Sequence, residues 1–389
     1  MACNRLAADL CGQRRQRRTF ASRCFGNRSR VQFLMAVILL PFAWIYAGVM
    51  AVRNWLYDHG WKRTETFAVP LLNVGNLRVG GTGKTPHVIW LVEELLRQGH
   101  RPAILSRGYG RQTKGPRLAG PADSAVTVGD EPWQYFEQFA ARKVAVAVAE
   151  KRRLGAHLVL REHPETTVIV LDDAYQHRAV RPTLNILLTE LARPFYEDDV
   201  LPAGRLRESR VGAERADVVI VTKCPPNLSE AAQLAVAQQV GRYGRPDVPV
   251  LFSAYEYALP QSLLSSPDAN ALGLPVVPAA GPALLLTGIA QPGPLREELE
   301  QQGYTIQYHA QFPDHHAFAP TDLTALRAHW QPGWPIFTTE KDATRLLAPE
   351  LRAAQAGLPL YTIPVRVAFL NDGGAVLRQL LPPAPAAGA

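Results

Sequence analysis

The sequence predicts an α/β protein with a parallel β-sheet core, a second and smaller α/β domain, and an N-terminal hydrophobic helix. Beyond residue 66, short apolar runs alternate with helical stretches, which is the pattern of strand–helix–strand units. A Pro- and Ser-rich stretch at residues 257–282 interrupts this pattern, which then resumes. The apolar segment 31–52, which precedes the first expected strand, contains no charged residue.

The expected elements follow the chain in order. In the first part we predict helices over residues 84–98, 132–140 and 151–161, and strands over residues 67–74, 102–106, 144–148, 167–171, 184–188 and 218–222. In the second part we predict helices over 294–302 and 321–329, and strands over 283–287, 305–309, 336–339 and 360–364. The expected domains are a basic arm (1–30), a membrane-associating helix (31–62), a core (63–225), a smaller C-terminal domain (226–381) and a disordered tail (382–389).

The positive charge of the chain is concentrated in its first thirty residues. The whole chain has a net charge of +8, and residues 1–30 hold eight arginines and one aspartate, a net +7, which leaves about +1 for the rest. A nearly neutral body lacks the broad basic surface of a nucleic-acid-binding protein, so no nucleic acid is expected as a partner. Only Cys224 lies outside this arm, which suits a reducing compartment.

The apolar segment 31–52 is long enough to span a bilayer, because a helix rises about 1.5 Å per residue across a core of about 30 Å. We favour a helix that lies in one leaflet, kinked at Pro41, with its aromatic residues near the lipid headgroups. A full span, a buried core helix and a cleaved signal peptide are the alternatives. Met35 is an alternative start to Met1, in which case the basic arm is not translated.

A glycine-rich loop joins the first expected strand to the first helix of the core. Such a loop binds phosphate groups through backbone N–H groups and the positive end of the helix dipole. Lys84 is expected to reach the β- and γ-phosphates of a nucleotide, and the Thr85 hydroxyl to bind Mg²⁺. Arg78 stands where the usual motif has its first glycine. The loop predicts an ATP-binding core of the P-loop NTPase type, with nucleotide-binding residues Gly80, Gly81, Thr82, Gly83, Lys84 and Thr85.

Acidic residues follow at two places. Asp172 and Asp173 end an apolar strand, where the carboxyl edge of the sheet places them beside the phosphate loop as Mg²⁺ ligands. A simple turn is the alternative. Asp130 and Glu131 precede Pro132 at a helix start, where acids commonly cap the helix. Asp130 is also the candidate carboxylate for accepting the proton of an alcohol substrate.

Three further motifs carry polar side chains on expected loops. In SRGYGR (106–111) and LPAGRLRE (201–208), arginines such as Arg107 and Arg205 are candidates for binding substrate or phosphate, although ordinary turns would explain them too. FPDHHAF (312–318) places two histidines beside Asp314. Since no further ligands occur at metal spacing, a proton-relay or orienting role for one histidine is more economical than a metal site.

These motifs, in the order GNLRVGGTGKTP, LSRGYGR, VGDEP, LDDAYQHR, LPAGRLRE, FPDHHAF and TTEKDA, closely resemble those of the tetraacyldisaccharide 4′-kinases of lipid A biosynthesis. The resemblance covers roughly residues 35–370. It implies an ATP-dependent lipid kinase that phosphorylates the 4′-hydroxyl of a tetraacyl glucosamine disaccharide 1-phosphate to form lipid IVA. It also implies a location on the cytoplasmic face of the bacterial inner membrane, and no protein partner.

The resemblance also implies roles for individual residues. Asp130 resembles the catalytic base of the family, paired with His315, and Lys84 its phosphate-binding lysine. The metal-side residues are Thr85, Asp172, Asp173 and Glu131, and the expected substrate or phosphate contacts are Tyr109, Arg152 and Arg207. For the last two, the neighbouring Arg153 and Arg205 are alternatives. Ala174 and Tyr175 replace the Gly-Phe pair of the usual acidic motif, and both carboxylates remain.

A second functional hypothesis is a GTPase-like metallochaperone or partner-activating NTPase with the same type of loop. The segment VTKCP (221–225) is faintly similar to a guanine-binding Thr-Lys-x-Asp motif, but Pro225 stands where the aspartate should be. The hydrophobic segment also favours the lipid kinase. A nucleic-acid-binding module built on the basic arm is a third possibility.

Overall fold

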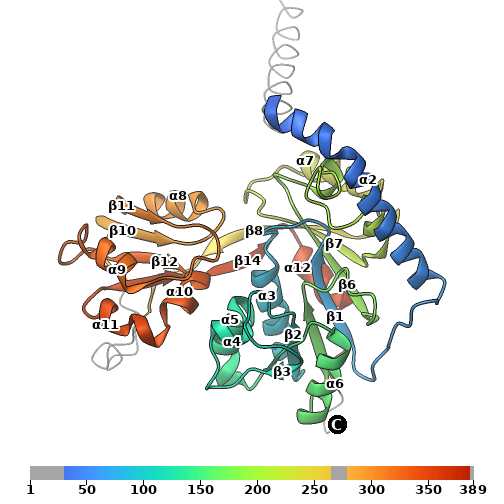
Figure 1. Ribbon diagram of the computed structural model, residues 1–389, viewed down its shortest axis with the longest axis horizontal. Coiled ribbons are helices and arrows are strands. Elements are labelled where there is room, and N and C mark those ends of the chain that lie inside the picture. Colours follow the sequence, from blue (N-terminus) through green and yellow to red (C-terminus); the bar gives the residue numbers. More distant parts are fainter. Residues whose placement is uncertain (1–29, 264–277, 386–389) are drawn as a thin grey trace, which may run out of the picture.

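The computed structural model describes residues 30–263 and 278–385, with side chains from residue 38 onward. The expected basic arm up to residue 29, the centre of the Pro- and Ser-rich stretch and the last four residues of the tail therefore lie outside the described residues. Two sheets form two lobes, the larger on the right and the smaller on the left in Figure 1.

The larger sheet has nine strands in the order β14-β8-β7-β6-β1-β5-β2-β4-β3. All neighbours pair in parallel except the two edge pairs, β14–β8 and β3–β4, which are antiparallel. The strands are β1 (Leu71–Asn76), β2 (Pro102–Ser106), β3 (Arg117–Leu118), β4 (Ala145–Val148), β5 (Val168–Asp172), β6 (Leu184–Glu190), β7 (Val218–Thr222), β8 (Val250–Tyr257) and β14 (Val365–Phe369).

Helices cover both faces of this sheet. Leu72 and Val74 of β1 pack in one cluster with residues of α3, whereas Leu71 packs in another with residues of α6. Such alternation is what a strand buried between two helical layers requires, and each fully buried Leu or Val contributes about 1.5–3 kcal/mol. The helices of this lobe are α3 (Lys84–Arg97), α4 (Ala125–Val128), α5 (Asp130–Phe139), α6 (Arg152–Glu162), α7 (Glu230–Gly241) and α12 (Gly373–Leu380).

The smaller sheet has five strands in the order β11-β10-β12-β13-β9, and only β9 is antiparallel to its neighbour. Its strands are β9 (Gln261–Ser262), β10 (Pro282–Thr287), β11 (Thr305–Gln311), β12 (Ile336–Thr339) and β13 (Leu360–Ile363). Its helices are α8 (Gly293–Gln301), α9 (Pro320–Arg327), α10 (Glu340–Leu346) and α11 (Arg352–Gln355). The expected α/β fold with two sheets is confirmed.

Strand pairing divides the chain differently from the expected boundary at residue 225. Strands β8 and β14 and helix α12 belong to the larger lobe, although their residues lie in the range 226–381. The chain leaves the larger sheet after β8 and returns through β14, and the Ala258 N–H donates to the Pro364 carbonyl where the two connections run side by side. In Figure 1 these two strands bridge the lobes.

Helix α2 (Arg30–Asp58) contains Pro41 and runs along the outside of the larger lobe (Figure 1). Its part Ile38–Asp58 is apolar and long enough to cross a bilayer, and only 6% of its apolar window is buried. One side docks on the lobe: the Tyr46 hydroxyl donates to the Arg207 carbonyl at 3.0 Å and Asn54 Nδ2 to Glu208 at 2.9 Å. The other side leaves large apolar residues exposed, so the alternative of a buried core helix does not hold.

Candidate active site

The phosphate loop connects β1 to α3 at the carboxyl edge of the larger sheet. Gly80 and Gly83 have φ angles of 123° and 86°, which side chains rarely tolerate. A β-carbon at residue 83 would lie 2.1 Å from the Tyr255 hydroxyl, so only glycine fits there. Around Gly80 and Gly81 the space is open, which leaves room for a ligand against the backbone.

Arg78 explains why the first glycine of the usual motif can be absent. Its Nε donates to Asp198 Oδ2 at 2.6 Å, and its guanidinium lies 3.8 Å from Glu190. The neighbouring Val79 N–H donates to the Arg205 carbonyl at 2.8 Å. These contacts hold the loop against the segment 198–208 through a side chain that glycine lacks.

Two threonines fix the middle of the loop. Asn76 Nδ2 donates to the buried Thr82 hydroxyl at 2.7 Å, and the Thr222 hydroxyl donates to the Thr82 carbonyl at 2.9 Å. His87, one turn into α3, lies 2.7 Å from the Gly83 carbonyl and 3.0 Å from the Ser253 hydroxyl. Burial lowers the pKa of His87 to about 4, so this histidine is neutral and donates from Nδ1 to Gly83. These bonds hold the shape of the loop from within the protein.

Asp172 and Asp173 lie beside this loop as expected. Residue pairing sets Asp172 next to Val74 of β1, and the Ser106 hydroxyl at the end of β2 donates to Asp172 at 2.9 Å. Burial, with the nearby Asp173 and Glu131 carboxylates, raises the pKa of Asp172 to about 6. A buried acid with acidic neighbours is a place where a cation would be favourable.

Asp173 is in a different environment from Asp172. Both of its carboxylate oxygens lie 2.9 Å from one Arg207 nitrogen, and Lys84 Nζ lies 3.8 Å away. Burial opposes its ionisation, but the charges of Lys84 and Arg207 hold the pKa of Asp173 below its usual value. Asp173 adopts a φ of 48°, whereas Ala174 is not among the residues with a positive φ, so the backbone at residue 174 does not require glycine.

Arg152 is placed otherwise than expected. It is fully buried at the start of α6, where it donates to the carbonyls of Ala149 at 2.8 Å and Asp172 at 2.9 Å. A guanidinium enclosed in this way supports the strand end that carries the two aspartates, and a direct contact with substrate is excluded in this arrangement. Arg153, the alternative, points outward and lies 3.6 Å from Glu65. For the other arginine pair, Arg207 rather than Arg205 reaches the acidic motif.

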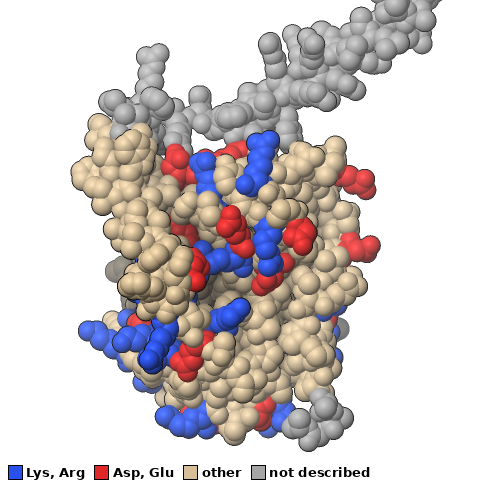
Figure 2. Space-filling model, turned by 90° about the vertical axis from the view of Figure 1, so that its right-hand side faces the viewer, with Lys and Arg blue, Asp and Glu red and all other residues tan. Residues whose placement is uncertain are grey.

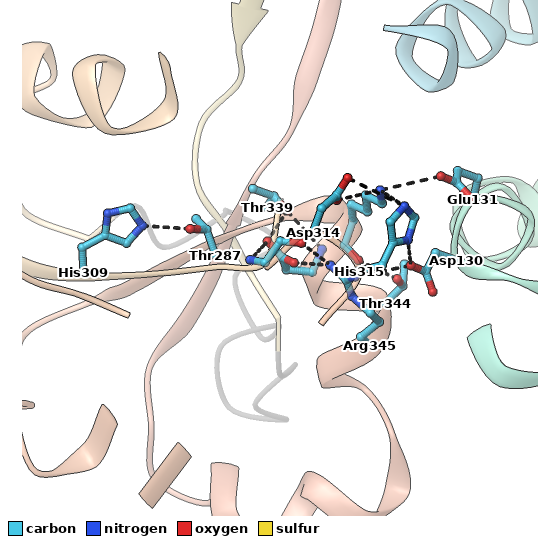
Figure 3. A network of polar contacts seen from close by, with 12 residues as sticks. Asp130, Glu131, Thr287, His309, Asp314, His315, Thr339, Thr344 and Arg345 are labelled. Carbon is cyan, nitrogen blue, oxygen red and sulfur yellow. Dashed lines mark hydrogen bonds and ion pairs between the residues drawn. The ribbon is translucent and has the colours of Figure 1, made fainter. Parts of the chain in front are cut away.

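The second half of the site joins Asp130 of the larger lobe to His315 of the smaller lobe. Asp130 begins α5, and His315 Nδ1 lies 2.9 Å from its Oδ2 (Figure 3). Burial alone would raise the pKa of Asp130, but the His315 hydrogen bond and the charge of Arg345 hold it below its usual value. Asp130 is therefore an ionised carboxylate at the junction of the lobes. The neighbouring His316 is engaged otherwise, with Asp322 at 2.9 Å and in a stack on Phe312.

Two cations of α10 join this junction and were not assigned from the sequence. Lys341 Nζ lies 3.0 Å from His315 Nε2, 3.3 Å from Asp314 and 3.7 Å from Glu131. Arg345 lies 3.4 Å from Asp130. The motif TTEKDA contains Lys341, so it was a signal for this element, but nothing in the sequence indicates that α10 faces α5.

The remaining candidates surround the junction. Tyr109 is 71% exposed, and its ring centre lies 6.2 Å from that of His315, so it is accessible to a substrate. Arg111 instead turns away to Glu150 and the Gly115 carbonyl, and is structural. Within the described residues, no three His, Cys, Asp or Glu side chains are grouped closely enough to hold a metal ion by themselves.

Comparison with known proteins gives a consistent result. The family model described as tetraacyldisaccharide-1-P 4′-kinase matches residues 35–382. The chain is 40% identical to the tetraacyldisaccharide 4′-kinase of Bacteroides thetaiotaomicron, covering 86% of this chain and 89% of that protein. It is 38% identical to the enzyme of the same name from Cytophaga hutchinsonii, covering 87% and 93%.

A solved structure is similar as well. The crystal structure of LpxK from Aquifex aeolicus in complex with ATP has a TM-score of 0.67 and 27% identity, and covers 89% of this chain and 98% of that one. None of these similarities supports the alternative of a GTPase-like metallochaperone. Taken with the phosphate loop and the motifs that surround it, they show that this chain belongs to the tetraacyldisaccharide-1-P 4′-kinase family.

Proposed function

We propose that this protein transfers the γ-phosphate of ATP to the 4′-hydroxyl of a tetraacyl glucosamine disaccharide 1-phosphate, which yields lipid IVA. The observation that carries the proposal is the pairing of Asp130 with His315 at 2.9 Å, across the junction from a phosphate loop. A kinase that acts on an alcohol needs both halves: a cradle for the nucleotide phosphates and a carboxylate to accept the hydroxyl proton.

On the nucleotide side, the backbone of Gly80–Gly83 binds the phosphates and Lys84 neutralises the charge on the transferred group. Lys84 lies 3.8 Å from Asp173, close enough for the carboxylate to aim its ammonium group. Arg207 pairs with the same aspartate and adds positive charge beside the phosphates. Arg152 acts indirectly, by holding the backbone of Asp172 in place.

Mg²⁺ in such sites uses one or two carboxylates and completes its coordination with phosphate oxygens and water, so the absence of a three-residue cluster among the described residues does not argue against it. The donors that fit are hard oxygens from Thr85, Asp172, Asp173 and Glu131. Of the two adjacent aspartates, Asp172 fits better, because Arg207 already occupies both oxygens of Asp173. When bound, Mg²⁺ neutralises charge that develops on the phosphate oxygens.

On the acceptor side, Asp130 accepts the proton of the 4′-hydroxyl as the oxygen attacks the γ-phosphorus. His315 donates its Nδ1–H to Asp130 Oδ2, which orients the carboxylate and stabilises its ionised form. The exposed ring of Tyr109 offers an apolar and hydrogen-bonding surface for the sugar beside the histidine.

The lipid acceptor places the protein at a membrane, and α2 is the element that suits this. Phe42, Trp44, Ile45 and Val49 are each at least 60% exposed. Figure 2 views the face along which α2 lies and shows acidic and basic side chains interspersed, so the helix, rather than a patch of one charge, provides the membrane contact. We place the protein on the cytoplasmic face of the bacterial inner membrane, with α2 lying in one leaflet.

Replacing Ile45 by aspartate is expected to lower binding to lipid vesicles by about 10–100-fold, because the burial of one large aliphatic side chain contributes about 1.5–3 kcal/mol. Co-sedimentation with phospholipid vesicles measures the effect. The matched control is Leu259→Asp, since Leu259 is 62% exposed and lies between β8 and β9, in the connection from the larger lobe, on which α2 docks, to the smaller lobe. Equal binding by the Ile45 variant and wild type would contradict membrane contact through α2.

The kinase activity is tested with purified protein, γ-labelled ATP and the tetraacyl disaccharide 1-phosphate in detergent. We expect labelled lipid that depends on both the protein and Mg²⁺. ATP hydrolysis without labelled lipid would contradict the proposed acceptor. The same lipid with its 4′-hydroxyl already phosphorylated serves as the control acceptor and should take up no label.

A further inference from the structure

We propose that Arg345 is a positioning residue that fixes the carboxylate of Asp130 across the junction of the two lobes. The proposal rests on the proposed function, in which Asp130 is the base. Arg345 lies on α10 of the smaller lobe and Asp130 at the start of α5 in the larger lobe, and the two side chains meet at 3.4 Å (Figure 3). The resemblance and the comparisons assign no role to this arginine.

The side chain of Arg345 is itself fixed by contacts within the smaller lobe. This side chain is 7% exposed and pairs with Asp342, and its Nη2 donates to the Gly288 carbonyl at 3.1 Å. The guanidinium carbon also lies 5.7 Å from the centre of the Phe318 ring. Asp342 is fully buried, and its Oδ2 accepts from the Gly288 N–H at 3.1 Å and from Thr339. A guanidinium fixed on several sides can impose an orientation on the group that it meets next.

The group that it meets is one oxygen of Asp130. Arg345 and His315 both contact Oδ2, at 3.4 and 2.9 Å. Two donors on the same oxygen define the rotation of the carboxylate and direct Oδ1 as the oxygen that accepts the substrate proton. Without Arg345, the hydrogen bond from His315 alone would leave the carboxylate free to turn about it.

The groups that hold Arg345 also position His315. The His315 N–H donates to the Gly288 carbonyl at 3.1 Å, the oxygen that Arg345 also contacts. His315 has a φ of 62°, a conformation that non-glycine residues adopt only where the surroundings hold it. Asp342 and Gly288 therefore hold both donors to Asp130, which are Arg345 and His315. This arrangement explains why a buried arginine lies at a junction between lobes.

The test compares the kinetics of Arg345→Met and Arg345→Lys with those of Arg327→Met. Arg327 is the matched control, because its guanidinium also donates to backbone carbonyls of the smaller lobe, those of Ala354 and Ala356, but away from Asp130. We expect Arg345→Met to lower kcat by about 10–100-fold, the cost of a misplaced reacting group, with little change in the KM for ATP. Arg345→Lys keeps the positive charge but lacks the planar guanidinium, so its kcat should lie between those of Arg345→Met and wild type.

A second measurement separates positioning from a general loss of structure. In an Asp130→Asn background, either Arg345 change should lower the remaining rate by less than about threefold, since groups that act as a unit are not additive. A full fall in kcat of about 10–100-fold when Arg345 is changed in the Asp130→Asn background would overturn the proposal. So would an unchanged kcat in the variants that carry the Arg345 change alone. If Arg345→Met does not fold, the decision rests on Arg345→Lys, measured both in the wild-type and in the Asp130→Asn background. Absence of labelled lipid from wild type and Arg327→Met would overturn the proposed function, and with it this role.

Discussion

Replacing Asp130 by alanine is expected to lower kcat by about 10²–10⁴-fold while the affinity for ATP stays nearly unchanged, as the loss of general-base catalysis predicts. The carboxylate is ionised and 2.9 Å from His315, and it belongs to the junction rather than to the phosphate loop. Steady-state transfer of label to the lipid gives kcat, and binding of a non-hydrolysable ATP analogue gives the affinity.

Asp322→Asn is the control for this experiment. Asp322, in the smaller lobe, pairs with His316 at the same 2.9 Å, but His316 stacks on Phe312 and does not contact Asp130. We expect this variant to stay close to wild type in kcat. If Asp130→Ala instead abolished ATP binding, Asp130 would belong to the metal site, and the assignment of a base would have to move to another residue.

Lys84→Met should lower kcat by about 10²–10³-fold, the effect of removing one preorganised group that stabilises transition-state charge. Lys84 starts α3, so its ammonium group is presented at the end of the loop where the phosphates lie. Methionine keeps the apolar part of the side chain and lacks the ammonium group, and Arg207 remains to pair with Asp173, so the fold should persist.

The matched control for Lys84→Met is Lys114→Met, which removes one positive charge from an exposed position. Thermal unfolding of both variants checks that the fold is intact, and turnover with saturating ATP separates the loss in kcat from weaker binding. Unchanged turnover in Lys84→Met would contradict the assignment of this loop to the γ-phosphate.

Local features of the site were predictable from the sequence. A strand, a glycine-rich loop, a lysine and a helix lie in one continuous segment, and β2, β7 and β12 begin and end where the apolar runs do. The two aspartates could be placed because the carboxyl ends of parallel strands share one edge of a sheet. These inferences need only neighbours along the chain or the general rules of α/β folds.

Features that depend on distant contacts were not predictable. Whether Arg152 faces a ligand or the interior depends on which side of α6 packs on the sheet, and the sequence pattern left that open. Arg345 acts across the junction on a residue more than two hundred positions earlier. The membership of β8 and β14 in the larger sheet depends on their mutual pairing, which no local pattern reveals.

The route of the chain through β8 and β14 makes the smaller lobe an insertion within the larger one. No single cut of the chain can therefore release the nucleotide-binding lobe intact, because β14 and α12 would be lost with everything after the cut. Tyr257 and Val365 are direct register partners in antiparallel strands. A two-residue hairpin such as Asn-Gly could join them, so the larger lobe is separable by an internal replacement but not by truncation.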